Sequence, residues 1–364
     1  MKGRDLWREP PARWDSGRSA LLLNPRLEAF WRELVFAADF PGLPEHVWIA
    51  TSGTSGRLKV VALSRAAFAT SAVAVNKHLS AGPRDSWLNP LPLFHVGGLG
   101  IVVRAALSGS RCQFLADWDA HDFSRRVAAF GTTLSSLVPA QVHDLVSARL
   151  RCPPSLRGMV VGGGALDEVL RLRAAELGWP LLPSYGLTEA CSQVATANPG
   201  AQDSAWLPLL DHIAARLGEG GILELRGPSL LTGWMLFERD GSARWEDPKI
   251  DGWFRTSDRC ELRGGNLRVL GRADDLVKIR GELVDVAALE RELQKRVPSG
   301  LVRIDVGPDE RNSGELTVVA ENSSAQAEAR GSLDLFPPYA KPSVFRVGAV
   351  ELSVLGKKIR AIGG

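Results

Sequence analysis

The chain contains several short segments whose side chains could bind phosphate. The first is a run of hydroxyl and glycine residues followed closely by a lysine, Thr51-Ser52-Gly53-Thr54-Ser55-Gly56 and Lys59. The backbone N–H groups and hydroxyls of such a loop can donate hydrogen bonds to a polyphosphate, and the lysine adds positive charge. It is not a Walker A loop, because no lysine directly follows the second glycine. Taken alone, the run fits a flexible Ser/Gly turn equally well.

A second segment, Ser184-Tyr185-Gly186-Leu187-Thr188-Glu189, combines an aromatic ring with a hydroxyl and a carboxylate. Tyr185 offers a flat face for a nucleotide base. Thr188 and Glu189 could position a phosphate and a hard cation, for which a carboxylate oxygen is the natural ligand. By themselves these six residues fit a structural strand-to-helix turn better.

Two further segments lie nearer the C-terminus. In Gly252-Trp253-Phe254-Arg255-Thr256-Ser257-Asp258, Asp258 can accept hydrogen bonds from both hydroxyls of a ribose, and Arg272 of the later run Gly271-Arg272-Ala273-Asp274-Asp275 could complete that grip. The tail, Gly356-Lys357-Lys358-Ile359-Arg360, could bring a cation to charge developing on a phosphate and a carboxyl group. In isolation, Asp258 fits a turn former and the tail fits a solvated basic end.

Alternating strands and helices must position these segments. Apolar spacing predicts a helix over residues 27–38 and a helix that begins at Ser64, which is a plausible N-cap. Strands are predicted at 47–50, 87–91, 111–115, 133–138, 158–161 and 181–184, with helical segments such as 98–108 and 124–130 between them. This alternation predicts an α/β sheet with parallel strands.

The pattern changes after about residue 205. Short strands predicted at 222–226, 255–256, 261–263 and 267–270 indicate a β-rich subdomain. Beyond Arg272, a helix over 286–296 and strands at 303–306 and 316–320 indicate a small α+β unit, and 322–331 fits a surface loop or an exposed helix. With 364 residues, two domains are the default expectation, and we place them at 1–272 and 273–364.

Composition narrows the class of protein. A net charge of +3 with dispersed charges argues weakly against a nucleic-acid-binding protein. The cysteines, which lie far apart at Cys112, Cys152, Cys191 and Cys260, indicate neither a zinc ribbon nor a thioredoxin-type site. The start of the chain has no apolar signal segment, and no apolar run reaches the roughly 20 residues that span a bilayer. These features predict a cytoplasmic protein without membrane insertion.

Together, the segments resemble the adenylate-forming superfamily of acyl-CoA synthetases, nonribosomal-peptide adenylation domains and luciferases. The hydroxyl/glycine loop, the Y-G-x-T-E run, the T-S-D segment, G-R-x-D-D and the terminal G-K-x-x-R occur in the family's order between residues 51 and 360. The resemblance implies a large N-terminal α/β domain with a β-rich subdomain, followed by a small mobile C-terminal α+β domain. It also implies an enzyme that activates a carboxylic acid with Mg²⁺ and ATP as an acyl-adenylate and passes the acyl group to a thiol, coenzyme A.

Residue by residue, the resemblance assigns roles to the segments. It implies that residues 51–56 and Lys59 hold the ATP phosphates. It also implies that Gly163, Gly164, Tyr185 and Gly186 contact the adenine, that Thr188 and Glu189 contact the phosphate and magnesium, and that Asp258 and Arg272 contact the ribose. The implied hinge is Asp274, and Lys357 is implied to support adenylation. Lys278 and Gly281 belong to the segment that is implied to face the active site during thioester formation.

The chain also departs from the family. Leu58 and Val60 replace the usual Pro and Gly beside the loop lysine, and Lys358 is a second lysine beside the expected one. The chain is shorter than typical members, mostly at the front. Whether a second subunit compensates for this is left open, so a homo-oligomer stays one alternative.

Two segments resemble o-succinylbenzoate–CoA ligases in particular. Residues 91–99 resemble P-L-F-H-x-x-G-L, which implies that His95 lies near the acyl pocket, although a packed core histidine is the alternative. Residues 185–196 resemble Y-G-M-T-E-T-x-S-Q-x-x-T. Ser192, Gln193 and Thr196 are candidate donors to the second carboxylate of such a substrate, but the sequence does not identify the cation that this carboxylate needs.

The resemblance therefore suggests a ligase of menaquinone or phylloquinone biosynthesis. Three alternatives stay open: a CoA ligase for another aryl or acyl acid, an adenylation domain that loads a carrier protein, and a non-catalytic relative that senses a nucleotide.

Overall fold

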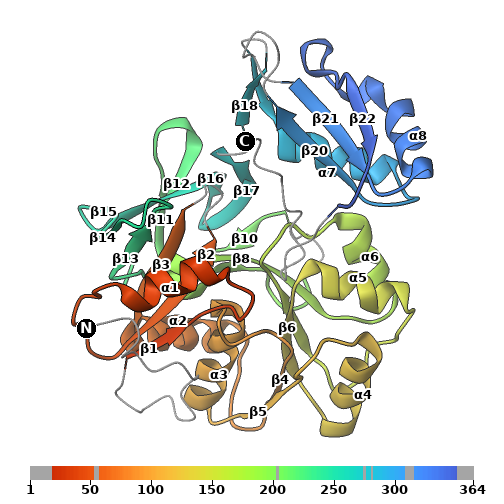
Figure 1. Cartoon of the computed structure of the whole chain (residues 1–364). Helices are drawn as coiled ribbons and strands as arrows, with labels where there is room; N and C mark the ends of the chain where they lie inside the picture. The colour runs from red at the N-terminus through yellow and green to blue at the C-terminus, as the bar shows by residue number, and fades with distance from the viewer. Residues whose placement is uncertain are drawn as a thin grey trace. The chain divides into compact units, whose positions relative to one another are not determined.

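The computed structural model describes residues 19–52, 57–201, 205–273, 276–279, 282–307 and 315–350 (Figure 1). The chain divides into two compact units, which are described separately. The first comprises residues 1–216, 224–255 and 262–268, and the second comprises 217–223, 256–261 and 269–364. The domain boundary predicted at residues 272 and 273 stays a prediction.

The main sheet of the first unit has the strand order β5-β4-β6-β7-β8-β9. Its strands are β4 (Ser86–Asn89), β5 (Arg111–Phe114), β6 (Leu134–Leu137), β7 (Gly158–Val161), β8 (Leu181–Leu187) and β9 (Ser192–Thr196). The strands from β5 to β8 pair in parallel, whereas β9 runs antiparallel to β8. The predicted α/β sheet with parallel strands is confirmed.

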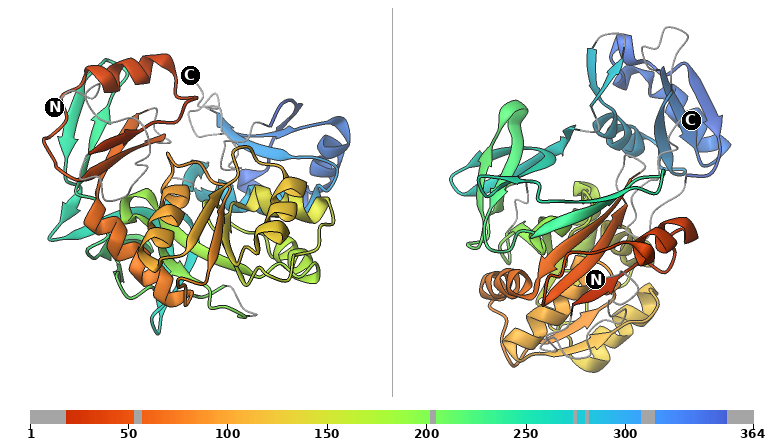
Figure 2. Two further views of the ribbon diagram at one scale, coloured as in Figure 1. Left: turned by 90° about the horizontal axis from the view of Figure 1, so that it is seen from below. Right: turned by 60° about the vertical axis from the view of Figure 1, so that its left-hand side comes forward.

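Helices cover both faces of this sheet, as the views in Figure 2 show. Side chains of successive strand residues point to opposite faces. Leu88 accordingly joins the core under α4 (Ala120–Phe130), α5 (Pro139–Ser147) and α6 (Glu168–Glu176), while Trp87 joins the core under α2 (Arg65–His78) and α3 (Val96–Ser108). Ser64 caps α2 as predicted, because its Oγ accepts a hydrogen bond from the N–H of Ala67 at 3.0 Å.

A second sheet of the first unit positions the hydroxyl/glycine run. Its strand order is β1-β2-β3-β13-β14, with β1 (Ala20–Leu22), β2 (His46–Ser52), β3 (Leu58–Ser64), β13 (Gly233–Phe237) and β14 (Ala243–Glu246). Helix α1 (Ala29–Ala37) packs on it through Trp31 and Val35. Strand β3 was not predicted. Because Ser52 pairs with Leu58, the hydroxyl/glycine run lies between two antiparallel strands in the sequence.

A third sheet, with the order β10-β17-β16-β12-β11, is divided between the two units. Its strands are β10 (Leu207–Pro208), β11 (Ala214–Leu217), β12 (Ile222–Arg226), β16 (Trp253–Arg263) and β17 (Asn266–Arg272), and β15 (Lys249–Ile250) pairs with β16. The segments predicted as strands at 255–256 and 261–263 are strand residues, but they belong to the single strand β16 and not to two separate strands. The side chains of Thr256 and Cys260 are buried, so β16 continues through the polar residues that lie between them.

The rest of the second unit is a small α+β structure. It contains β18 (Leu276–Ile279), β19 (Glu282–Asp285), β20 (Val302–Gly307), β21 (Glu315–Ala320), β22 (Val344–Val347), α7 (Val286–Arg296) and α8 (Ser323–Gly331). The segment that fitted either a loop or an exposed helix is α8, whose N-cap Asn322 accepts a hydrogen bond from the N–H of Ala325 at 2.9 Å.

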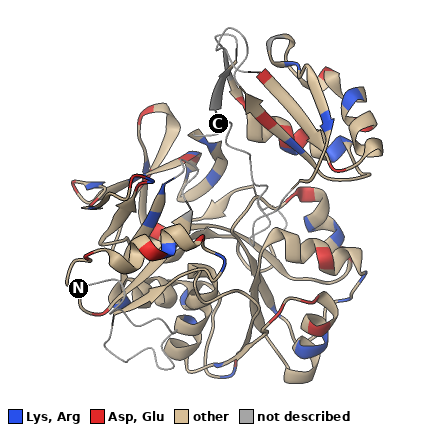
Figure 3. Cartoon of the chain, viewed as in Figure 1, with Lys and Arg blue, Asp and Glu red and all other residues tan. Residues whose placement is uncertain are grey.

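Lys and Arg residues alternate with Asp and Glu residues along the described elements, without a long block of either sign (Figure 3). Within the described part of the chain, no helix is both long enough and apolar enough to cross a membrane.

Candidate active site

One edge of the main sheet gathers several of the predicted site residues. The loop that ends at His95 follows β4, Gly163 and Gly164 follow β7, and Tyr185 and Gly186 lie near the end of β8. Because these strands are parallel, their carboxyl ends meet at the same edge, where open α/β sheets bind ligands. Gly163 adopts a φ of +79°, and both it and Gly164 are exposed. Strand β8 continues through Leu187, so Tyr185 and Gly186 are strand residues and not part of a strand-to-helix turn.

Thr188 and Glu189 lie in the short 3-10 helix η2 (Thr188–Ala190) between β8 and β9. The carbonyl of Glu189 accepts a hydrogen bond from the N–H of Leu231 at 2.7 Å, which fixes this turn to the rest of the unit. The described residues contain no group of three or more His, Cys, Asp or Glu side chains that could hold a metal ion. Magnesium in nucleotide enzymes binds through one or two carboxylates and the substrate phosphates, so the single carboxylate of Glu189 fits that mode.

Lys59 lies directly opposite Thr51 in the β2–β3 pairing. Its Nζ is 4.3 Å from the centroid of the Trp234 ring. The indole N–H of Trp234 donates to Glu246 Oε2 at 3.1 Å. Hydrogen bonds from Arg244 and Trp234 lower the pKa of Glu246, and the nearby charge of Lys59 lowers it further. Ser52 ends β2, and Gly53, Thr54, Ser55 and Gly56 lie outside the described residues.

Arg104 on α3 is a buried cation that contacts the predicted acid-binding residues, and it was not identified from the sequence. Its Nη2 donates to Ser192 Oγ at 3.1 Å. The carboxamide oxygen of Gln193, in the orientation that satisfies its neighbours, accepts from both terminal nitrogens of Arg104 at 3.1 and 3.0 Å, and the amide nitrogen then faces Thr196 Oγ1. The predicted acid-binding residues Ser192, Gln193 and Thr196 therefore form one buried network around a cation.

The hydrogen-bond partners described for the Arg104 guanidinium are uncharged. The side chain is only 2% exposed, and burial lowers its pKa to about 10. Among the described residues, the Nε of Arg104 has no hydrogen-bond partner, and no carboxylate charge offsets the lowering of its pKa. One signal could have revealed it, because Arg104 is the lone charge in the otherwise apolar helix of residues 96–108.

His95 is the N-cap residue of α3, the helix that carries Arg104. Burial lowers its pKa to about 4, so the ring is neutral at pH 7, and its Nε2 is buried without a hydrogen-bond partner among the described residues. The loop before it is fixed by a close approach. A Cβ on Gly98 would lie 2.4 Å from the carbonyl oxygen of Pro92, and Asn89 Nδ2 donates to the carbonyl of Gly98 at 2.9 Å.

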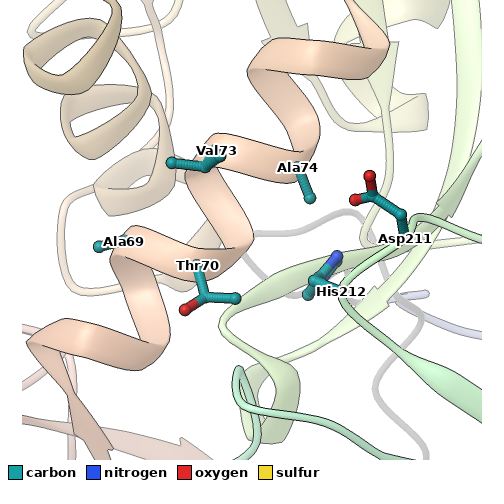
Figure 4. A pocket seen from close by; sticks show the side chains of 6 residues that line it. All are labelled: Ala69, Thr70, Val73, Ala74, Asp211 and His212. Carbon is teal, nitrogen blue, oxygen red and sulfur yellow. The ribbon is translucent and has the colours of Figure 1, made fainter.

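A pocket of about 370 Å³ lies between α2 and Asp211-His212 (Figure 4). Its walls are small side chains of α2, and Figure 4 shows Thr70 and His212 facing each other across it. None of its lining residues was predicted as a site residue. Burial lowers the pKa of His212 to about 4, and the charge of Arg104 acts in the same direction.

The second unit carries the residues expected to hold a ribose. Asp258 lies on β16, where its N–H donates to Thr256 Oγ1 at 3.0 Å, and Arg272 ends the neighbouring strand β17. Lys278 lies on β18, where it pairs with Leu283. Asp274, Gly281 and Lys357 lie outside the described residues.

The cysteines are free thiols. Burial raises the pKa of Cys112 to about 11 and that of Cys152 to about 12, and it also raises the pKa of Cys191. Burial is likewise the main cause that raises the pKa of Cys260 to about 12. Thiols of this kind are poor nucleophiles at neutral pH.

Comparisons with known proteins agree with this geometry. Residues 46–217 match the family model of the AMP-binding enzyme. A 2-succinylbenzoate–CoA ligase from Bacillus licheniformis is 33% identical over 256 residues, which is 67% of this chain and 53% of that protein. The ligase of the same name from Bacillus cereus is 31% identical over 286 residues, covering 74% of this chain and 57% of that protein. The chain thus spans about half the length of the curated relatives it matches.

Solved structures show the same fold. Wild-type E. coli MenE with a bound phenylether-linked analogue of OSB-AMS has a TM-score of 0.64 and 27% identity, over 88% of this chain and 69% of that chain. O-succinylbenzoate coenzyme A synthetase from Bacillus subtilis, in complex with AMP, has a TM-score of 0.75 and 23% identity, over 93% of this chain and 77% of that chain.

Proposed function

Because the chain belongs to the AMP-binding enzyme family, we propose that it is an AMP-forming acid–CoA ligase that converts o-succinylbenzoate to o-succinylbenzoyl-CoA. The proposal places it in the cytoplasm and in menaquinone or phylloquinone biosynthesis. Its ligands are the acid, Mg·ATP and coenzyme A.

The observation that carries the choice of acid is the buried cation Arg104. A buried charge is expensive unless it is paired. The described partners of this guanidinium are the neutral side chains of Ser192 and Gln193, so an anion is needed to complete its environment. A substrate with two carboxylates supplies one to the reaction and one to the cation. Benzoate or a fatty acid has only the reacting carboxylate and would leave Arg104 unpaired.

In the first half-reaction, the substrate carboxylate attacks the α-phosphate of ATP and pyrophosphate leaves. Thr188 and Glu189 lie on η2, beside the strand ends, where they can orient the phosphate and hold magnesium. Bound magnesium supplies Lewis-acid stabilisation of the phosphate charge. The donors of residues 51–56, with Lys59 and Lys357, offset the negative charge that develops on the leaving group.

In the second half-reaction, the thiolate of coenzyme A attacks the mixed anhydride and AMP leaves. The proposal assigns Asp274 as the hinge that exchanges Lys357 for the segment with Lys278 and Gly281 between the two steps. Asp258 and Arg272 hold the ribose throughout.

The test is coenzyme A-dependent release of pyrophosphate with Mg·ATP and o-succinylbenzoate, beside benzoate and a medium-chain fatty acid. Preferential turnover of o-succinylbenzoate supports the proposal. Turnover of another acid alone would retain the ligase and reject the substrate. Acyl transfer to a holo-carrier protein but not to coenzyme A would identify a carrier-loading domain, and ATP binding without any turnover would identify a nucleotide sensor.

A further inference from the structure

We propose that the left-handed turn at Cys191-Ser192 is a positioning device that fixes the acid-binding residues relative to the phosphate-binding residues. The proposal rests on the proposed function for the identity of these two sets. Cys191 has a φ of 56° and Ser192 a φ of 112°, values that L-residues with a Cβ rarely adopt. Two such residues in succession store strain, which persists only where the surrounding structure imposes it.

The turn directly joins the element that carries the phosphate-binding residues to the strand that carries the acid-binding residues. Cys191 is the C-cap residue that follows η2, whose residues Thr188 and Glu189 are assigned to the phosphates. Ser192 begins β9 and receives the hydrogen bond from Arg104 at 3.1 Å, which belongs to the acid-binding network. A change of backbone angle at these two positions therefore shifts one half of the site against the other.

Two hydrogen bonds and one close backbone contact hold the turn in place. The N–H of Cys191 donates to the carbonyl of Thr188 at 3.1 Å, and the carbonyl of Cys191 accepts from Ser71 Oγ of α2 at 3.4 Å. The carbonyl of Ser192 lies against Gly186, where a Cβ would come within 2.0 Å of that oxygen. The register of β8 and β9 also shifts at this point, between Tyr185 and Gly186. The close approach of the Ser192 carbonyl therefore requires glycine at position 186.

The residue type at position 191 is informative. Glycine would adopt this φ without strain, but it would also allow many other backbone conformations. The Cβ of cysteine excludes most of these conformations, and the side chain is only 1% exposed. Burial also raises the pKa of its thiol, which leaves the side chain an inert packing group. Cys191 is thus a positioning residue that acts through the backbone of Ser192.

The test compares Cys191→Gly with Cys191→Ala. Alanine removes the thiol but keeps the Cβ and its restriction, whereas glycine removes both. We expect Cys191→Gly to raise the KM for o-succinylbenzoate about 5- to 10-fold, because a small misplacement of a binding group has a large effect. The KM for ATP should stay within about twofold, since the phosphate-binding residues lie before the turn. Cys191→Ala should keep both constants near those of the wild type.

A second readout needs no turnover. Hydrogen exchange of the backbone amides of residues 188–196 should become faster in Cys191→Gly and in Ser71→Ala, which removes the bond to the Cys191 carbonyl, but not in Cys191→Ala. An equal effect of glycine and alanine would overturn the proposal, because packing of the thiol alone would then explain it. Unchanged exchange in Cys191→Gly would also overturn it. Wild-type protein that does not turn over o-succinylbenzoate would instead reject the proposed function, and the exchange result would still decide the role of the turn.

Discussion

At the scale of single residues, Arg104 links the geometry to the choice of substrate. It contacts Ser192, which lies 88 residues further along the chain. The resemblance of residues 185–196 to a ligase motif led to Ser192, Gln193 and Thr196 as candidate donors, but a local motif could not reveal which cation they surround. The lone charge in an apolar helix was visible, yet only the fold shows that the helix turns it towards β9.

Replacing Arg104 with methionine should remove the preference for a dicarboxylate. We expect kcat/KM for o-succinylbenzoate to fall by about 30- to 1000-fold, the effect of deleting one partner of a buried charge pair. Arg104→Lys should lie between the two, because a lysine keeps the charge but not the two-pronged geometry. A Met variant with unchanged selectivity would contradict this role.

His212 should make stability depend on pH. Burial lowers its pKa from 6.5 to about 4, so the unfolded chain binds more protons than the folded chain between these values. The free energy of unfolding must therefore fall as pH decreases through this range, by at most about 3 kcal/mol for this residue. Urea unfolding at several pH values should show a shallower dependence in His212→Leu. His143→Leu is the matched control, because His143 is a largely exposed histidine on α5.

At the scale of elements, the sequence predicted those with strong local signals. The bounds predicted for β7 (Gly158–Val161), β12 (Ile222–Arg226) and α7 (Val286–Arg296) agree with the structure. Strand β3 was missed because its short apolar run follows a glycine-rich loop and lacks a turn signal before α2. The pairing of β3 with β2 and β13 decides its conformation, and that pairing is not a local property.

The loop that carries His95 depends on a close approach of two elements. In Gly98→Ala the new Cβ would lie 2.4 Å from the carbonyl oxygen of Pro92, so the loop must move away from α3. We expect this change to reduce the free energy of unfolding by about 1–3 kcal/mol and to raise the KM for the acid. Gly82→Ala is the control, because no atom lies within 4 Å of its new Cβ. Equal stability of the two variants in urea would show that the approach is not restrictive.

At the scale of the whole molecule, the proposed two-step reaction assigns roles to residues of both units. The match to the AMP-binding enzyme family covers residues 46–217, which lie in the first unit except for Leu217. The residues assigned to the ribose and to the exchange between half-reactions lie in the second unit. The order of the motifs in the sequence suggested that these roles belong to different parts of the chain. The residues of the hinge and of the tail lie outside the described part of the chain.

Lys357→Ala separates the two half-reactions. Adenylation should fall by about 100- to 1000-fold, the scale of losing one donor to the transition state. Transfer from preformed acyl-adenylate to coenzyme A should stay near the wild-type rate, because this lysine is assigned to the first step only. Pyrophosphate release and thioester formation, followed separately, check this. Lys358→Ala is the matched control, and a loss of adenylation in that variant instead would move the assignment by one residue.

The most direct test of the central claim compares two acids on the wild-type protein. One is o-succinylbenzoate, and the other is 4-oxo-4-phenylbutanoate, the same molecule without the ring carboxylate. Because the site provides a buried cation for a second carboxylate, kcat/KM for pyrophosphate release should favour o-succinylbenzoate by about 100-fold or more. Equal values for the two acids would contradict the claim that Arg104 receives a substrate carboxylate.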